Sequence, residues 1–272
     1  MALAAAMCAA CGSAAAPAEV APTSGAPVVA AVPGMAGEAV RLRTDEAIGG
    51  RFQVRITDTG DTPFSVTAVA LESPGFTALP ATAVTAEFAP GRVIDLPTPY
   101  GEPVCDASPA PVAARLTVVR GGGAGESLLV PLDGDALDVI HDEECAVQAV
   151  TEVVDIAVTG LADDGDALVG SLTLARRSGD EQVVASALNR SVLIEPVAED
   201  LPLELGPDDG SATTAVSFTP ATCDPHVLSE TKKPYVFPLV VRVGDAEPVP
   251  VDLPFDQAAL DRLAALVQRV CG

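Results

Sequence analysis

The chain has 272 residues and a mass of 27.4 kDa, which suits two β-domains of about 110–125 residues each better than one. Apolar residues make up 49% of it, enough for hydrophobic cores, but aromatic residues make up only 3% and there is no Trp. The 38 acidic residues outnumber the 15 basic ones and give a formal charge of −23. A surface this negative repels phosphate backbones, which excludes nucleic acid as a partner and disfavours anionic membrane surfaces.

The first eleven residues form a short apolar stretch, MALAAAMCAAC, in which the small residues Ala9 and Ala10 precede Cys11. This stretch resembles a bacterial lipoprotein signal, and the resemblance covers about the first 13 residues. It implies that residues 1–11 are a signal segment and that Cys11 is lipidated as the mature N-terminus. The stretch departs from the family in having no Lys or Arg before its apolar run. The alternative is an Ala-rich terminus with two incidental cysteines.

Residues 12–37 are rich in Ala, Pro, Gly, Ser and Val, and their only charged residue is Glu19 near the start. Such a segment buries too little side chain to offset the entropy lost on ordering, which predicts a semi-extended, disordered linker. Elsewhere the sequence has no uninterrupted run of the ~20 apolar residues that a membrane span needs. We therefore expect the lipid to be the anchor.

An internal repeat organises the remaining residues. Cys105 and Cys223 are each followed by Asp, then by two β-rich runs separated by a turn, an acidic residue, and a helical stretch that ends near Cys145 or Cys271. The two copies are offset by 118 residues at the first cysteine and by 126 at the second. Upstream, the alternating apolar residues of 52–56 correspond to those of 168–174.

Four cysteines allow three disulfide pairings, and a duplicated module that carries its own bridge selects Cys105–Cys145 and Cys223–Cys271. Each bridge closes a loop that stabilises the fold by about 4 kcal/mol in the chain-entropy model. The alternative is a zinc site made of four thiolates. It is disfavoured because the successive separations of 40, 78 and 48 residues include no C-x-x-C pair.

Strands are predicted from period-2 alternation of apolar and polar residues. Residues 51–56 and 64–71 show it on either side of a turn, which predicts a hairpin. Further strands are expected at 92–96, 115–120 and 127–132. Helices are expected from Asp135 to Cys145 and from Asp256 to Val270, the second with Asp256 as N-cap and an apolar stripe on one face.

These features predict an all-β protein of two tandem antiparallel sandwiches, each closed by a short C-terminal helix and one disulfide. The architecture resembles the immunoglobulin-like (Ig-like) modules of bacterial surface proteins, although the buried Trp of antibody domains is missing and each cysteine pair lies late in its module. The strand order is left open. We expect the first module at residues 38–148 and the second at 149–272, with a rigid or hinged connection near 146–152.

The sequence offers few groups for catalysis. It has two histidines, His141 and His226, which fall at non-equivalent places in the repeat, and it has neither a G-x-S-x-G nor an H-E-x-x-H motif. We expect His141 to be an exposed helix residue. The glycines of 121–125 are expected to form a turn because a strand follows them. Acidic clusters at 133–135, 163–166 and 208–209 are favoured turn sequences, with calcium ligation as the alternative.

We therefore expect no enzymatic activity, no catalytic or metal-binding residues and no cofactor. The predicted function is that of a non-catalytic lipoprotein, a binding or structural module of the bacterial cell envelope. The lipid on Cys11 would anchor it to the outer face of the cytoplasmic membrane. Its partner would be an unknown envelope protein or cell-wall component. The acidic surface suits a basic partner, or simply solubility. The alternatives are a hydrolase that uses carboxylates in a cleft between the modules, and a carrier of a small ligand or metal.

Overall fold

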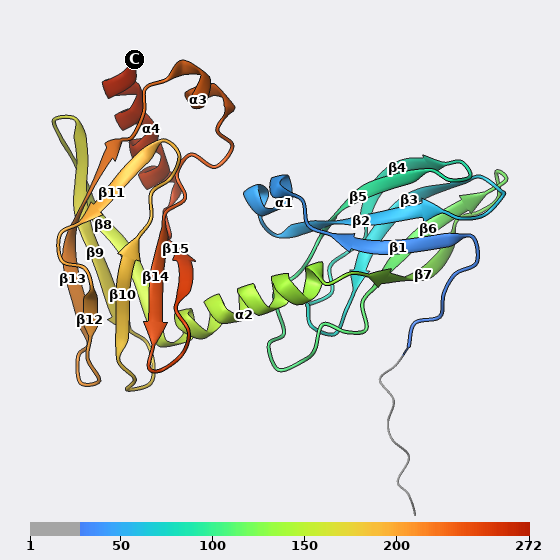
Figure 1. The fold of residues 1–272 in the computed structure, drawn as a ribbon, viewed down its shortest axis with the longest axis horizontal. Coiled ribbons are helices and arrows are strands. Elements are labelled where there is room, and N and C mark those ends of the chain that lie inside the picture. The colour runs from blue at the N-terminus through green and yellow to red at the C-terminus, as the bar shows by residue number, and fades with distance from the viewer. Residues whose placement is uncertain (1–27) are drawn as a thin grey trace, which may run out of the picture.

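The computed structural model describes residues 28–272, which form two β-rich modules joined by helix α2 (Ala136–Val153) (Figure 1). Cys11, the predicted signal segment and residues 12–27 of the predicted linker lie outside the described residues. The last residues of that linker, from Met35, instead belong to the first strand. Met35 and Ala39 are buried there although the segment is poor in large apolar residues.

The first module is one seven-stranded sheet with the order β4-β3-β6-β7-β1-β2-β5. All neighbouring strands are antiparallel except β1 and β7, whose parallel pairing joins the two parts of the sheet. Strand β5 also contacts β3 and β4, so the sheet is nearly closed into a barrel. The strands are β1 (Met35–Val40), β2 (Arg51–Asp58), β3 (Phe64–Glu72), β4 (Thr82–Phe88), β5 (Val93–Pro99), β6 (Ala113–Arg120) and β7 (Glu126–Asp133), and the short helix α1 (Arg43–Ile48) follows β1.

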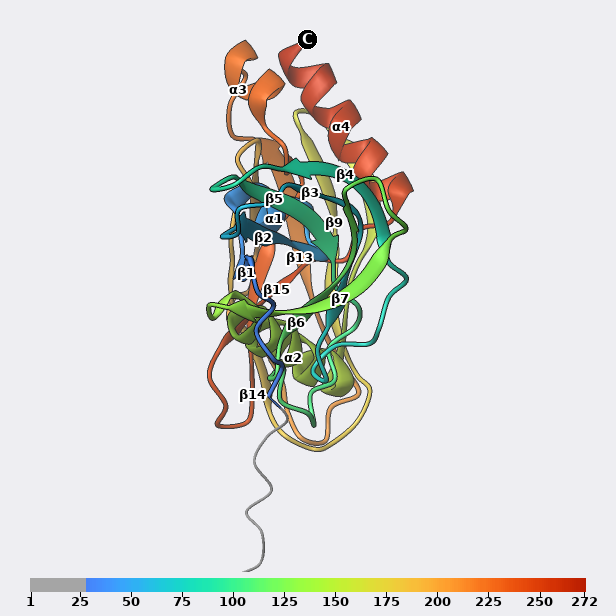
Figure 2. The ribbon, with the colours of Figure 1, turned by 90° about the vertical axis from the view of Figure 1, so that its right-hand side faces the viewer.

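The second module has two four-stranded antiparallel sheets, β11-β13-β9-β8 and β12-β10-β14-β15. The consecutive strands β11 and β12 belong to different sheets, so the chain crosses from one sheet to the other between them. The strands are β8 (Val154–Asp164), β9 (Ala167–Arg176), β10 (Val183–Leu188), β11 (Ile194–Ala198), β12 (Leu203–Leu205), β13 (Ser211–Pro220), β14 (Pro238–Val243) and β15 (Val249–Asp252). Helices α3 (Pro225–Glu230) and α4 (Gln257–Cys271) complete the module, and both lie at the top in Figure 2.

The two modules use their strands in the same order. In each, the second strand (β2 or β9) lies between the first strand and the strand β5 or β13. The third strand (β3 or β10) pairs with β6 or β14. That strand pairs in turn with the last strand of the module (β7 or β15), and a helix follows the last strand. The alternating apolar residues that suggested the repeat lie on β2 and β9. Phe52, Val54 and Ile56 are fully buried, as are Leu168, Leu172 and Leu174.

The predicted hairpin of residues 51–56 and 64–71 is wrong. Both segments are strands, but β2 pairs with β1 and β5, whereas β3 pairs with β4 and β6. The turn after β2 therefore carries the chain from one part of the sheet to the other. Alternation reveals which face of a strand is buried but not which strand lies beside it, because the apolar faces of β2 and β3 pack within one core.

Helix α2 is longer than predicted and continues through residues 146–152 to Val153. Leu137 and Ile140 on its first half belong to the core of the first module. Val147, Val150 and Val153 on its second half pack in the core of the second module. Because these apolar residues recur at helical spacing, one continuous helix satisfies both cores, and the predicted module boundary at 148/149 falls inside it.

Both predicted disulfides are present. Cys105 is bonded to Cys145 and Cys223 to Cys271, so each module is tied to the helix that follows its last strand. The predicted C-terminal helix is confirmed as α4, and the Asp256 carboxylate accepts a 2.8 Å hydrogen bond from the backbone N–H of Ala259. The helix buries Leu263, Leu266 and Val267.

Within residues 28–272, none of the helices has the length and apolar character needed to cross a lipid bilayer.

Candidate functional site

The residues singled out in the sequence lie apart in the fold. The glycines of 121–125 connect β6 to β7, and Gly244 and Asp245 connect β14 to β15, so both segments are the expected turns. His226 is exposed in the first turn of α3. Among the described residues, no three His, Cys, Asp or Glu side chains are grouped so as to hold a metal ion.

His141 is not exposed as expected but buried, with 6% of its surface accessible. Its ring packs edge-on against Phe76, with the ring centroids 5.5 Å apart. Its Nε2 lies 3.2 Å from the carbonyl oxygen of Val104 and 3.7 Å from the sulfur of Cys145. The disulfide draws the loop before β6 over this side of α2, and this loop covers the ring.

A cleft of about 1090 Å³ lies between the modules. The end of β1, helix α1 and helix α2 line it on one side, and β14, β15 and the loop before β14 line it on the other. This arrangement is visible in Figure 1, where α2 runs beneath α1 toward the second module. The side chains that give the cleft its chemistry are Arg41, Glu46, Tyr100, Asp142, Glu143, Glu144, Lys233, Pro238, Glu247, Pro248, Val249, Pro250, Val251 and Asp252.

The lining of the cleft is acidic. It includes six carboxylate residues but only two basic ones, Arg41 and Lys233. The walls on the side of β15 are formed by prolines and valines, which bring little hydrogen bonding of their own. A cavity of this size, with apolar walls and several charges of one sign, fits an extended segment or a small molecule of the opposite charge.

Helix α2 holds two of these carboxylates in place through partners from the first module. Glu143 forms a 2.6 Å ion pair with Arg41, at the end of β1. Glu144 accepts a 2.8 Å hydrogen bond from the Tyr100 hydroxyl. Desolvation, helped by the neighbouring negative charge of Glu144, raises the pKa of Tyr100 to about 12. Tyr100 therefore remains a hydrogen-bond donor at neutral pH.

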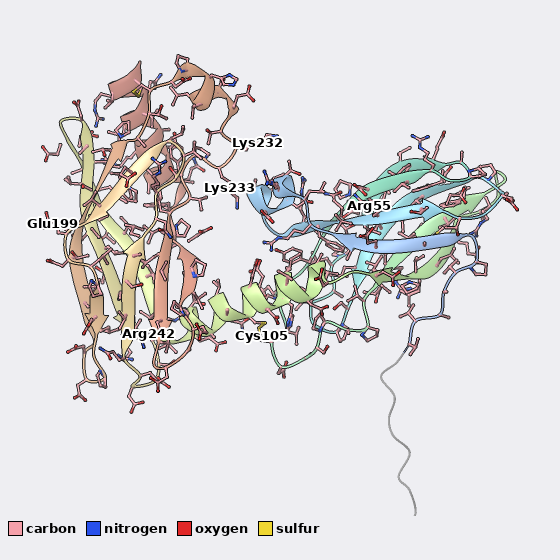
Figure 3. The ribbon with its side chains drawn as sticks, viewed as in Figure 1. Arg55, Cys105, Glu199, Lys232, Lys233 and Arg242 are labelled. Atoms are coloured by element: carbon pink, nitrogen blue, oxygen red, sulfur yellow. A yellow bond between two sulfur atoms is a disulfide. The ribbon has the colours of Figure 1, made fainter. Side chains whose placement is uncertain are left out.

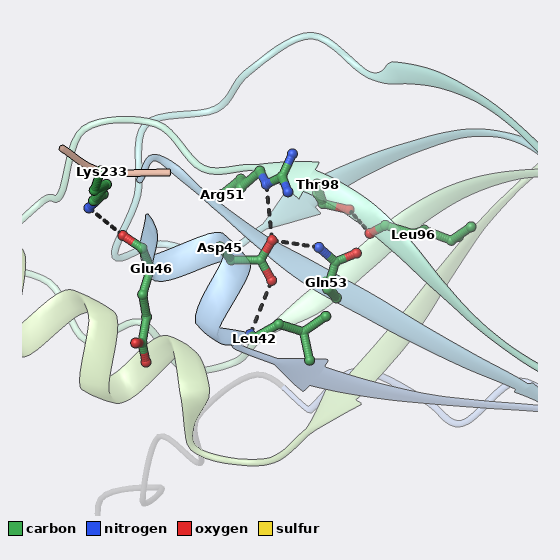
Figure 4. A network of polar contacts seen from close by, with 8 residues as sticks. All are labelled: Leu42, Asp45, Glu46, Arg51, Gln53, Leu96, Thr98 and Lys233. Atoms are coloured by element: carbon green, nitrogen blue, oxygen red, sulfur yellow. Dashed lines mark hydrogen bonds and ion pairs between the residues drawn. The ribbon is translucent and has the colours of Figure 1, made fainter. Parts of the chain in front are cut away.

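Helix α1 is fixed by a buried carboxylate, Asp45 (Figure 4). One oxygen of Asp45 accepts hydrogen bonds from Arg51 Nε at 2.9 Å and from Gln53 Nε2 at 2.7 Å. The other accepts from the backbone N–H of Leu42 at 3.1 Å, which caps the helix. These bonds tie α1 to the neighbouring strand β2 and so set the position of Glu46 at the mouth of the cleft.

Lys233 links the two modules across the cleft. Its ammonium donates a hydrogen bond to the backbone carbonyl of Glu46 on α1 (Figure 4). In Figure 3 the loop that carries Lys232 and Lys233 reaches from the second module toward α1. Lys233 also lowers the pKa of Asp252, but desolvation outweighs this and the pKa is raised overall.

The sequence raised an inter-module cleft only within the hydrolase alternative and identified none of its residues, because they come from segments more than 200 residues apart that the bend between the modules brings together. One local indication existed: Lys232 and Lys233 are the only lysines of the chain and stand side by side. Two adjacent lysines in a chain with a formal charge of −23 suggest a nearby acidic surface.

No family model and none of the curated proteins compared matches the chain. Among solved structures it is similar to a transglutaminase from red sea bream, with 10% identity and a TM-score of 0.23 over 83% of this chain and 32% of that one. It is also similar to the BSP domain of a biofilm-associated protein, with 8% identity and a TM-score of 0.21 over 85% of this chain and 60% of that one. The chain thus spans about a third of the first protein and three fifths of the second.

Replacing Asp45 by alanine should lower the free energy of unfolding by about 3 kcal/mol, because it leaves the buried Gln53 amide and the Arg51 guanidinium without their acceptor. The adjacent Glu46→Ala variant removes an exposed side chain and should change stability by less than about 0.5 kcal/mol. Denaturant unfolding of both variants measures the difference. Equal effects would show that the Asp45 network does not hold α1.

The Tyr100 hydroxyl should ionise near pH 12 in the folded protein, above its ordinary value of 10. Because folding favours the neutral phenol, the stability it contributes is complete below pH 10 and is lost as pH rises toward 12. The phenolate absorbance of the Tyr235→Phe variant isolates this titration, since the chain has two tyrosines and no Trp. Glu144→Gln should lower the pKa, and ionisation of native Tyr100 at its ordinary pH would contradict the geometry.

Proposed function

We propose that this protein is a non-catalytic binding module of the bacterial cell envelope, built from two Ig-like sandwiches, whose inter-module cleft binds a cationic segment of a partner. In Ig constant-type domains, strands A, B, E and D form one sheet and C, F and G the other. The second module supports this assignment with β8-β9-β13-β11 and β10-β14-β15. In the first module β1-β2-β5 and β3-β6-β7 correspond in the same way, with β4 beside β3.

The observation that carries the proposal is the excess of carboxylates in the cleft, six against two basic residues. Asp142 on α2 and Glu247 before β15 are exposed on opposite sides of the cleft, where both can meet the same ligand. Lys233 already places one ammonium group at this cleft, where it donates to the backbone carbonyl of Glu46. A lysine-containing segment of another envelope protein has the same chemistry.

The alternative, a hydrolase with carboxylates in the same cleft, is supported less well. Sites that hydrolyse sugars generally offer aromatic faces for stacking, whereas the walls here are prolines and valines with Tyr100 as the aromatic lining residue. Of the carboxylates on α2, Glu143 is paired with Arg41 and Glu144 with Tyr100. These pairs suit a rigid charged surface better than a pair of acids that must exchange protons during a reaction.

The proposed location follows from the N-terminal resemblance. A lipid on Cys11 would anchor the chain to the outer face of the cytoplasmic membrane. Residues 12–34 would then separate the first strand, at Met35, from the bilayer. The net charge of −23 keeps the modules from adhering to anionic lipid, so the cleft stays available to a partner.

An oligolysine peptide should bind the full-length chain, and binding should weaken as salt is added. The triple variant Asp142→Asn, Glu247→Gln, Asp252→Asn should weaken binding about tenfold, because three partly exposed charge pairs at about 0.5 kcal/mol each are lost. Fluorescence anisotropy with labelled peptide measures both effects.

The control variant removes three negative charges that lie outside the cleft, with Asp166→Asn, Glu199→Gln and Asp208→Asn. These residues are exposed, and Glu199 lies on the face of the second module turned away from the cleft (Figure 3). It should leave affinity within about twofold of the original, because distant exposed charges are screened. Equal losses in both variants would mean that binding follows net charge alone and that the cleft is not the site.

Lipidation of Cys11 is tested by mass spectrometry of the N-terminal peptide after expression in a bacterium that processes lipoproteins. We expect a diacylglyceryl group on Cys11 and removal of residues 1–10. The Cys11→Ala variant should keep its upstream residues and be released from the membrane fraction. An unmodified Cys11 that still carries residues 1–10 would contradict the proposed anchor.

A further inference from the structure

The two disulfides have different polar neighbours, and the sulfur of the exposed Cys105 lies 3.4 Å from Oε1 of Gln148 on α2. In each, one cysteine is exposed (Cys105 or Cys223) and the other is half-buried at a helix (Cys145 or Cys271). The sulfur of Cys145 lies 3.7 Å from Nε2 of His141. The sulfur of Cys271 lies 3.7 Å from the carbonyl oxygen of Thr222.

The proton on the His141 ring can be assigned from its neighbours. Nε2 lies 3.2 Å from the Val104 carbonyl oxygen, which can only accept a hydrogen bond, so Nε2 carries the hydrogen. The sulfur of Cys145 lies 3.7 Å from the same nitrogen. Cys145 therefore has a hydrogen-bond donor beside it, whereas Cys271 has an acceptor.

This difference determines how readily the half-buried sulfur of Cys145 or Cys271 departs as a thiolate. In thiol–disulfide exchange the departing sulfur takes the electron pair and becomes a thiolate, and a leaving thiol of lower pKa departs faster. A donor beside the sulfur stabilises the thiolate. A carbonyl oxygen instead stabilises the protonated thiol. The carboxylates of Asp142 and Glu144, next in sequence to His141 and Cys145 on α2, oppose the thiolate at Cys145.

We propose that Cys105–Cys145 is a thiol–disulfide exchange site for a dithiol reductant, with His141 holding the departing thiolate. The reductant's first thiolate attacks the exposed Cys105 sulfur. The Cys105–Cys145 bond breaks, and Cys145 leaves as a thiolate that accepts the Nε2–H of His141. The reductant's second thiolate then displaces Cys105 from the mixed disulfide. The reductant loses two electrons and becomes a disulfide, and its two thiol protons pass to Cys105 and Cys145.

Reduction at this site would act on the cleft. The bridge ties the segment between β5 and β6 to α2, and that segment begins with Tyr100, which bonds Glu144. Opening the bridge frees one end of this connection while leaving Cys223–Cys271 closed. The exchange site rests on the His141 geometry alone and does not depend on the proposed ligand of the cleft.

The test uses the full-length oxidised chain treated with dithiothreitol at neutral pH, quenched by alkylation at successive times, with each bridge followed by peptide mass spectrometry. Both bridges meet the same dithiothreitol thiolate in one sample, so they are compared under equal conditions. Cys105–Cys145 should open about tenfold faster than Cys223–Cys271, because the His141 N–H beside Cys145 stabilises the departing thiolate.

Three variants at position 141 separate the hydrogen bond from packing. His141→Phe keeps a ring but removes the donor and should slow the opening of Cys105–Cys145 several-fold, leaving Cys223–Cys271 unchanged. His141→Gln keeps an N–H donor and should retain much of the rate, whereas His141→Leu should behave as His141→Phe. The Cys223–Cys271 rate reports folding, because unfolding would accelerate both bridges. Equal rates for the two bridges in the original chain, or no slowing in folded His141→Phe, would overturn the proposal.

Discussion

The sharing of one helix by two hydrophobic cores is the constraint on which the rest of the structure depends. Leu137 and Ile140 pack in the first core and Val150 in the second, so α2 can leave neither module without exposing apolar side chains. Burial of residues of this size stabilises by about 1.5–3 kcal/mol each. A helix held at both ends bends little, and the angle between the modules is therefore a property of the fold and not of a flexible linker.

The cleft is a consequence of that angle. Helix α2 forms its floor and supplies Asp142, Glu143 and Glu144, while β15 of the second module forms a wall. Two further contacts brace the arrangement: Asp45 fixes α1 from within the first module, and Lys233 reaches α1 from the second. The first disulfide supports the same region by holding the segment before β6 against α2. The Asp45 and Lys233 contacts, helix α2 and the first disulfide therefore all support the region around the cleft.

Features that depend on local sequence patterns or on the internal repeat were predictable. The alternation of residues 51–56 gave a strand, Asp256 gave the start of α4, and the repeated cysteine spacing gave both disulfides. Strand partners were not predictable in the same way, because β2 and β3 are adjacent in sequence and yet pair with other strands. The burial of His141 also depended on a distant segment, since the loop that covers it is held by Cys105. Predicting the cleft requires the relative position of the two modules, and residue patterns within individual strands do not contain that information.

Residual dipolar couplings of backbone amides test most directly whether α2 joins the modules rigidly. Couplings measured for β-strands of both modules, in one aligned sample of the full-length chain, should fit a single alignment tensor with the orientation seen in the structure. Two tensors of different magnitude for the two modules would show that they move independently. In that case α2 would not be shared by the two cores, and the cleft would have no fixed form.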